Sequence, residues 1–269
     1  MHRQQRTPAL AWVVFAVILL YLLVPIVGTA LYSVAVRWDS SLLPQGFTLA
    51  HYQALFSDLK AVNAMWRAVV VSVVTVVLLW LIVTPAVVAA HLYLPGMKRV
   101  LEIASIVPYA FPPVILAIGL IQLYSKPPLP ISGTPTILVL AYGVICLPYM
   151  VGAIGNSLQA IDGHTLMEAC ESLGATRWTA YRLVILPNIA PGLVSSGLLT
   201  FAVALGEFVL ANMLVGARFE TIQIRLVQLM RFNGHVASAL VMFYFALVAV
   251  ASLALLVGTR RYTDTVRGE

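Results

Sequence analysis

Long apolar runs alternate with shorter polar connections along this chain. Six of these runs contain few charged residues, and they cover residues 9–33, 66–90, 99–124, 134–156, 189–215 and 236–259. A helix needs about 20 mostly apolar residues to cross the hydrocarbon core of a bilayer. Backbone polar groups inside lipid must be paired internally, so runs of this length form helices. The pattern predicts an all-α, polytopic membrane protein with six transmembrane helices in a single domain over residues 1–269.

Prolines should distort several of these helices, because proline lacks a backbone N–H and clashes with the preceding turn. The third helix contains "PYAFPP", so we expect it to be the most distorted. Kinks are predicted at Pro25, Pro85, Pro108, Pro112 and Pro113.

Two of the connections carry their own patterns. "FTLAHYQALF", before the second helix, fits a small helix on the membrane surface. Its candidate membrane contacts are Phe47, Leu49, Tyr52, Leu55 and Phe56. "FETIQIRLVQLMRF" mixes the periods of strands and helices, and its pattern alone does not assign it.

Composition and charge exclude other classes of protein. The chain is 61% hydrophobic and 10% charged, whereas soluble domains carry about a quarter charged residues. The formal net charge of +6 fits anionic lipid headgroups more simply than nucleic acid. Cys146 and Cys170 do not suggest a disulfide framework.

Basic residues give an orientation. Six spans place both termini on one side of the membrane, and Lys and Arg are divided almost evenly between the two sides. The basic pairs next to spans, Lys98-Arg99 and Arg260-Arg261, favour termini in the cytoplasm. This orientation also places the loop over residues 158–187 in the cytoplasm.

The cytoplasmic loop contains "EACESLGATRWTAYRLVILP" and carries helix signals. Thr165 and Glu168 have the spacing of a capping box, so a helix should start there. Gly174 stands where a helix end needs positive φ, and Thr176 can cap a second helix. Pro187 should end that second helix. The loop therefore predicts two short helices joined at a glycine.

The same loop resembles the permease subunits of binding-protein-dependent ABC importers of the type I fold. Their cytoplasmic signature is E-A-A-x3-G-x9-I-x-L-P. The matching positions here are Glu168, Ala169, Cys170, Gly174, Val184, Leu186 and Pro187. Cys170 for Ala and Val184 for Ile depart conservatively from the signature. "FTLAHYQALF" and "GEFVLANMLVG" extend the resemblance over most of the chain.

The resemblance implies that the first short helix is a coupling helix that docks into a partner ATPase. The residues implied in coupling are Glu168, Ala169, Cys170, Leu173, Gly174 and Pro187. Small residues at 169 and 170 would allow another backbone to approach closely. The simpler interpretation is that Glu168 only caps its own helix and that the loop is a solvated connector.

The chain has no G-x-x-x-x-G-K-[ST] motif, so ATP would be hydrolysed by another chain and this one would not be an enzyme. The resemblance implies a homologous second permease subunit, two ATP-binding subunits that hold ATP and Mg²⁺, and an extracytoplasmic solute-binding protein. Membrane lipid is the other expected partner, and nucleic acid is not one. No cofactor is expected in this chain, which would sit in the bacterial inner membrane.

The fifth predicted helix carries its few polar and small residues within an arc of roughly 140°. They are Gly192, Ser195, Ser196, Thr200, Gly206 and Glu207. Such a stripe either lines a polar pathway or packs closely against another helix. We take Ser196, Thr200 and Glu207 as candidates for the substrate pathway, because ionisable residues within membranes usually face a cavity or a partner. An ion pair of Glu207 with Arg218 or with a neighbouring chain is the alternative.

The substrate is the least constrained part of the prediction. The chain looks most like permeases of the polyamine group, whose relatives also move ferric iron and aminoethylphosphonate; sugar permeases share the fold. An acidic Glu207 suits a cationic amine. A secondary transporter is a more distant alternative, since no internal repeat is visible. The five histidines are scattered, and no metal-ligand spacing is present.

Overall fold

A computed structural model describes residues 9–39, 41 and 43–267. The ends of the predicted 1–269 domain, at residues 1–8 and 268–269, lie outside the described part. The described residues are all-α apart from one short hairpin, and the chain forms two compact units. The first unit comprises Met1–Val62 and Leu226–Ala246, and the second comprises Asn63–Arg225 and Leu247–Glu269.

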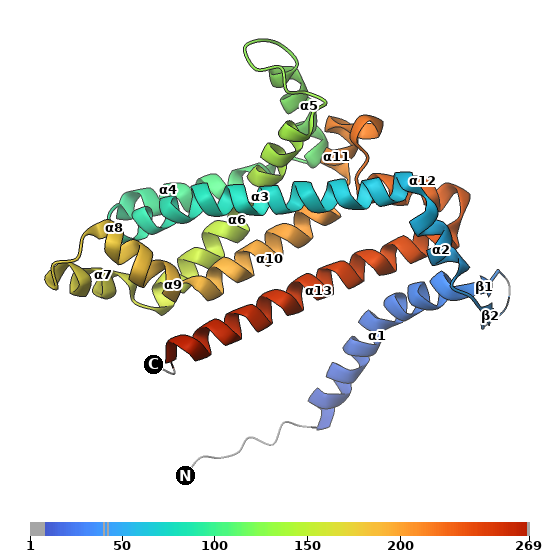
Figure 1. Cartoon of the computed structure of the whole chain (residues 1–269), viewed down its shortest axis with the longest axis horizontal. Helices are drawn as coiled ribbons and strands as arrows, with labels where there is room; N and C mark the ends of the chain where they lie inside the picture. The colour runs from blue at the N-terminus through green and yellow to red at the C-terminus, as the bar shows by residue number, and fades with distance from the viewer. Residues whose placement is uncertain (1–8, 40, 42, 268–269) are drawn as a thin grey trace. The chain divides into compact units, whose positions relative to one another are not determined.

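Four of the predicted apolar runs are single long helices. They are α1 (Ala9–Val34), α3 (Leu59–Leu92), α6 (Pro135–Ala160) and α13 (Gly234–Arg267), shown in Figure 1. In the described part of the chain, four helices are long and apolar enough to cross a membrane. The number rises to as many as six if each of two bent helix pairs counts as one span. The count of six spans therefore stays a prediction.

The third run is not one helix. α4 (Pro95–Ile106) and the 3₁₀ turn η1 (Val107–Ala110) meet α5 (Pro113–Tyr124) at a bend of 100°. Pro112 has an extended backbone, because the residue before a proline is kept out of the helical region. The expectation that "PYAFPP" distorts this helix is thus confirmed, while its continuity over 99–124 was wrong. Pro25 and Pro85, by contrast, lie inside the uninterrupted helices α1 and α3.

The fifth run is interrupted near both ends. α10 (Ala190–Gly206) is preceded by a helical segment, Arg177–Asn188, that is bent from it by 66°. Glu207 and Phe208 separate α10 from α11 (Val209–Leu214). The turn η3 (Gly216–Phe219) follows, and the unassigned segment "FETIQIRLVQLMRF" contains the helix α12 (Ile222–Phe232).

The first unit contains a hairpin that the sequence pattern did not predict. β1 (Ala35–Arg37) and β2 (Gln45–Phe47) pair antiparallel, with Ala35 opposite Phe47. The expected small helix is present as α2 (Ala50–Ser57). Phe47, Leu49 and Phe56 are exposed, as membrane contacts must be. Leu55 is fully buried, so its selection as a lipid contact was wrong.

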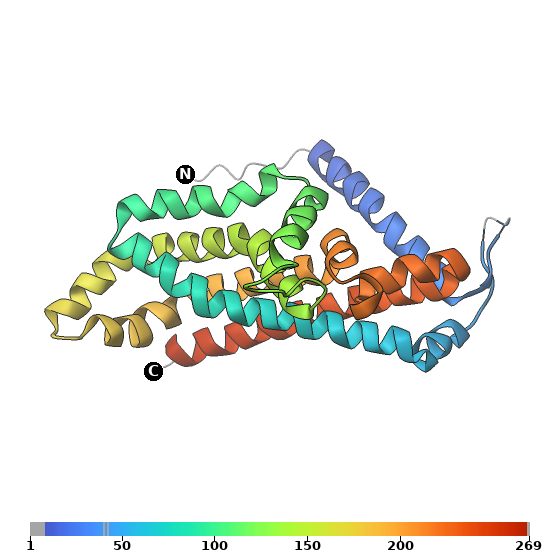
Figure 2. The same ribbon diagram turned by 90° about the horizontal axis from the view of Figure 1, so that it is seen from above.

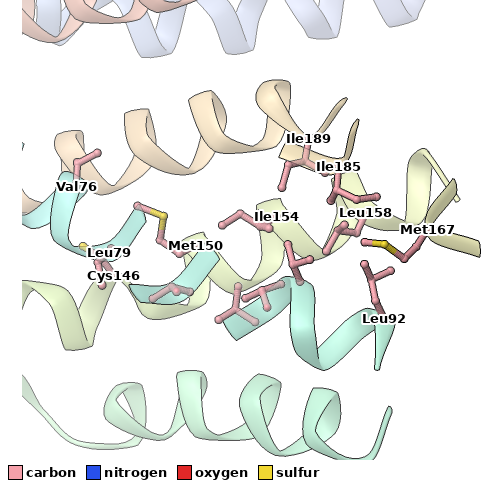
Figure 3. Close-up of a cluster of buried hydrophobic side chains, with 14 of the residues drawn as sticks. Val76, Leu79, Leu92, Cys146, Met150, Ile154, Leu158, Met167, Ile185 and Ile189 are labelled. Carbon is pink, nitrogen blue, oxygen red and sulfur yellow. The ribbon is translucent and has the colours of Figure 1, made fainter. Parts of the chain in front are cut away.

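The second unit is held together by two apolar clusters. One cluster joins the C-terminal half of α3 to α6 and to the residues around Ile185 and Ile189, and Figure 3 shows part of it. Within this unit α10 runs along α6, and Figures 1 and 2 show these helices beside α3. Gly197 permits the close approach of α3, because a Cβ there would collide with the Trp80 ring.

Candidate functional site

The helix α7 (Gly163–Ser172) begins earlier than the capping box predicted. Asp162 precedes it with φ 47°, and the Thr165 hydroxyl donates a hydrogen bond to the Asp162 carboxylate at 2.8 Å. Thr165 is therefore an interior residue of the helix, and its assignment as the cap was wrong. Glu168 instead lies 3.2 Å from His164 Nδ1, one turn earlier on the exposed side of the helix.

One face of α7 is anchored in the second unit. Met167 is buried, and it packs in the cluster that contains Leu92 of α3, Leu158 of α6 and Ile185, as Figure 3 shows. Cys170 is half-buried and packs against the same cluster. Cys170 therefore lies on the anchored face of α7. The family resemblance had implied that it contacts the partner ATPase.

The opposite face of α7 is open. Glu168, Ala169 and Gly174 are exposed, and Leu173 exposes 88% of its surface. Leu173 thus offers an exposed apolar side chain on the coupling loop, available for contact with another protein. We call Glu168, Ala169, Leu173 and Gly174 the coupling edge; the first two lie in α7, and the other two follow its last residue, Ser172.

The turn after α7 requires a glycine. Gly174 has φ 82°, its N–H donates to the Glu171 carbonyl at 2.9 Å, and the Ala175 N–H donates to the Cys170 carbonyl at 3.0 Å. This pair of hydrogen bonds is a Schellman motif, which ends a helix with a left-handed residue. The predicted role of Gly174 as a helix terminator is confirmed.

The second helix of the loop is tied to the first. Thr176 caps α8 (Arg177–Ala180) by accepting a hydrogen bond from the Thr179 N–H at 3.2 Å, as predicted. Arg177 Nε lies 3.1 Å from Glu171 Oε1, and its guanidinium stands over the Tyr93 ring at 4.7 Å. Burial raises the pKa of the Tyr93 hydroxyl, and the nearby Arg177 charge opposes that rise. α7, α8 and the α3–α4 connection therefore form one ordered projection.

Pro187 does not end the second helix. A π-helical turn, η2 (Tyr181–Ile185), precedes α9 (Leu186–Asn188), and the Leu186 N–H donates to the Tyr181 carbonyl. The wider turn changes the hydrogen-bond pattern before Pro187, which then stands at the start of α9, where its missing N–H is tolerated. The 66° bend follows at Ile189, so the helix ends later than predicted.

Two of the pathway candidates, Ser196 and Thr200, lie inside the second unit. Both are fully buried. The Ser196 hydroxyl donates to the Leu193 carbonyl at 2.8 Å and accepts from Trp80 Nε1 at 3.4 Å. The Cys146 thiol of α6 donates to the Thr200 carbonyl at 3.9 Å. Helix packing accounts for this part of the stripe, and a pathway role for both residues stays a prediction.

Glu207 adopts an arrangement that differs from both the pathway role and the ion pair expected from the sequence. Its carboxylate accepts hydrogen bonds from the N–H groups of Val209, Leu210 and Ala211, at 3.0, 2.8 and 3.1 Å. It therefore caps the N-terminus of α11, where a negative charge is favourable. The sequence contains a sign of this capping role: Glu207 directly follows Gly206, and this polar residue interrupts an apolar run.

The anchor of α7 was also missed. Gly163, Leu166, Met167 and Cys170 recur at the spacing of one helix face, which a period of 3.6 residues would have identified. Among the described residues, no group of three or more His, Cys, Asp or Glu side chains could hold a metal ion.

Residues 86–262 match the protein family described as "Binding-protein-dependent transport system inner membrane component". The chain is 25% identical over 214 residues to the spermidine/putrescine transport system permease protein PotC of Haemophilus influenzae, covering 78% of this chain and 82% of PotC. It is 26% identical over 200 residues to PhnV of Salmonella typhi, named for a 2-aminoethylphosphonate transport system; the match covers 74% of this chain and 75% of PhnV.

The fold has a counterpart among solved structures. A chain of a bacterial alginate ABC transporter, crystallised with an alginate pentasaccharide-bound periplasmic protein, superposes with a TM-score of 0.68 at 16% identity. The match covers 98% of this chain and 99% of the other. At this identity the likeness establishes the fold alone.

Proposed function

This chain belongs to the family of binding-protein-dependent transport system inner membrane components, and we propose that it forms half of a solute pathway that the coupling edge links to a partner ATPase. It is a permease subunit of an ABC importer. It is not itself the enzyme, because ATP is hydrolysed by a separate chain.

The observation that supports the coupling role is that one face of α7 is buried in the second unit while the residues of the coupling edge are exposed. Met167 is held among residues of α3, α6 and η2, while Leu173 and Glu168 face outward. A force on the coupling edge is therefore transmitted through a packed core to the ends of two long helices, since packed interiors deform little. A solvated connector would need neither the anchor nor the exposed Leu173.

The proposal places the 158–187 loop and both termini in the cytoplasm. Lys98 and Arg99 support this orientation, because they lie at the start of α4 on the same side of the second unit as α7, where Lys98 and His164 line one shallow pocket. Positive charge concentrates on the cytoplasmic side of membrane proteins.

The partners follow from the proposed role. A second, homologous permease chain would complete the pathway, and two ATP-binding subunits would bind ATP and Mg²⁺. An extracytoplasmic solute-binding protein would deliver the substrate, and the alginate transporter structure, with its periplasmic protein, gives a precedent for such a partner.

For the substrate we propose a small cationic solute such as a polyamine. The similarity to PotC supports this choice. PhnV makes aminoethylphosphonate the second candidate, while ferric iron and sugars are more distant. Ser196, Thr200 and Glu207 remain the candidate pathway residues, although the Glu207 carboxylate already caps α11.

Reconstitution tests the proposal. The chain is co-expressed with candidate permease, ATPase and binding-protein subunits, and the purified assembly is placed in proteoliposomes. We expect uptake of labelled spermidine that needs both ATP and the binding protein. Uptake that persists without ATP would favour a secondary transporter, and ATP-dependent uptake of aminoethylphosphonate alone would change the substrate but keep the role.

A further inference from the structure

A groove of about 600 Å³ lies between α3 and the segment that leads from α8 to α10, within the second unit. Its volume lies within the range of about 300–1,000 Å³ that is typical of ligand sites. Most of its wall is apolar, contributed by Leu81, Pro85, Leu186, Ala190, Leu193 and Val194. The coupling and pathway residues do not line it.

One end of the groove is lined by residue types that gather at the membrane–water interface. Trp178 and Tyr181 line it with their rings stacked at 5.5 Å, and Arg182 lies beside them. Arg182 is exposed and forms no ion pair with the described residues. Tryptophan and tyrosine gather at the level of lipid headgroups, and arginine extends its charge there from an apolar surface.

The segment Arg177–Asn188 has the orientation and the exposure of an interfacial helix. It is bent by 66° from α10, so it runs closer to the membrane plane than to the normal if α10 crosses the bilayer. Trp178 exposes 66% of its surface and Leu183 exposes 67%, on a segment that also carries two arginines. Apolar and basic side chains on one surface helix favour contact with anionic lipid.

A buried hydroxyl also lines the groove. Thr84 of α3 is 2% exposed, and its Oγ1 atom has no hydrogen-bond partner in the part of the chain that the structure describes. An unpaired buried hydroxyl is unfavourable, and a rotation of the Thr84 side chain toward the groove would let it pair with an acceptor on an occupant. An apolar occupant alone would leave the hydroxyl unpaired.

We propose that the groove binds an anionic phospholipid of the cytoplasmic leaflet. One acyl chain lies along the apolar wall, and the phosphate contacts the Arg182 guanidinium. An ester carbonyl of the lipid accepts a hydrogen bond from the Thr84 hydroxyl. The unpaired positive charge selects an anionic headgroup, and the apolar wall excludes a polar solute. This inference rests on the proposed function only for placing Arg177–Asn188 at the cytoplasmic membrane surface.

Lipid binding to the assembled transporter tests the proposal. The purified assembly is titrated with phosphatidylglycerol and with phosphatidylcholine of the same acyl chains, and native mass spectrometry counts the bound lipid. We expect about fivefold tighter binding of phosphatidylglycerol, since one basic residue near the surface contributes about 1 kcal/mol. Arg182→Gln should remove this preference. Arg99→Gln, which removes the same charge from the exposed start of α4, should keep it.

Two further measurements identify the occupant. Val194→Phe, which narrows the groove, should weaken the binding of both lipids. A photoreactive phenylalanine analogue at Trp178 should cross-link to lipid. Cross-linking to the second permease chain, or equal lipid preference in Arg182→Gln and wild type, would overturn the proposal. These readouts need no ATP, so a failure of ATP-driven uptake would contradict the proposed function without deciding this one.

Discussion

The Nε atom of Arg177 lies 3.1 Å from Oε1 of Glu171, and this contact joins the end of α7 to the start of α8. Both side chains remain partly exposed, at 71% and 39%. Solvent screens such a pair, and exposed pairs contribute about 0–1 kcal/mol. The contact therefore positions the two helices more than it stabilises the fold.

A double-mutant cycle measures this coupling. Glu171→Gln and Arg177→Gln, alone and together, should give an interaction free energy of unfolding below about 1 kcal/mol. The double variant should keep Arg182-dependent lipid binding, because neither residue lines the groove. An interaction energy of several kcal/mol would show that the pair is a main support of the projection.

Replacement of Gly174 should uncouple ATP hydrolysis from transport. In Gly174→Val a β-branched residue must adopt φ 82°, which costs about 1–2 kcal/mol and distorts the turn beside Leu173. We expect normal insertion into the membrane and at least tenfold lower uptake per ATP hydrolysed. Gly174→Asn should recover part of the uptake, because asparagine tolerates positive φ.

The matched control is Gly96→Val. A Cβ at Gly96 meets no atom within 4 Å, and this glycine does not have positive φ. Uptake should stay close to that of wild type. If Gly174→Val transports normally, the turn has no part in coupling.

Leu173 and Met167 allow docking to be separated from anchoring. Leu173→Ala removes an exposed side chain, so the free energy of unfolding should change by less than about 0.5 kcal/mol while ATPase co-purification falls. Met167→Ala removes a buried side chain and should cost about 2–5 kcal/mol. Thermal unfolding and pull-down of the ATPase measure the two effects. Retention of the ATPase by Leu173→Ala would remove Leu173 from the coupling edge.

The sequence predicted those parts of the fold that depend on long runs or on single-residue stereochemistry. Apolar runs located the long helices, and Gly174 located the end of α7 because few other residues adopt its backbone conformation. The bend between α4 and α5 was foreseen as a distortion, but its size depends on how α5 packs against α11. Such packing cannot be deduced from "PYAFPP".

Sequence spacing was an incomplete guide where one side chain has more than one possible hydrogen-bond partner. Thr165 had the spacing of a cap, but Asp162 came first and bound its hydroxyl. The pathway role suggested for Glu207 stays a prediction, and the structure adds a second role, because the carboxylate accepts hydrogen bonds from backbone N–H groups of α11. The start of α7 lies at Gly163, earlier than predicted, because helix boundaries depend on hydrogen bonds that composition does not reveal.

Glu207 is the residue at which capping and substrate binding can be distinguished. Glu207→Ala removes the carboxylate that accepts from the first three N–H groups of α11 and should cost about 0.5–2 kcal/mol of unfolding free energy. Glu207→Gln keeps one carbonyl oxygen for the Leu210 or Ala211 N–H, so its thermal stability should lie between those of Glu207→Ala and wild type. If the charge also attracts a cationic substrate, Glu207→Gln should raise the KM for spermidine several-fold, and Glu207→Asp should restore most of it. A Glu207→Gln variant with unchanged KM and a lowered Tm would leave Glu207 as a cap of α11 and withdraw it from the pathway.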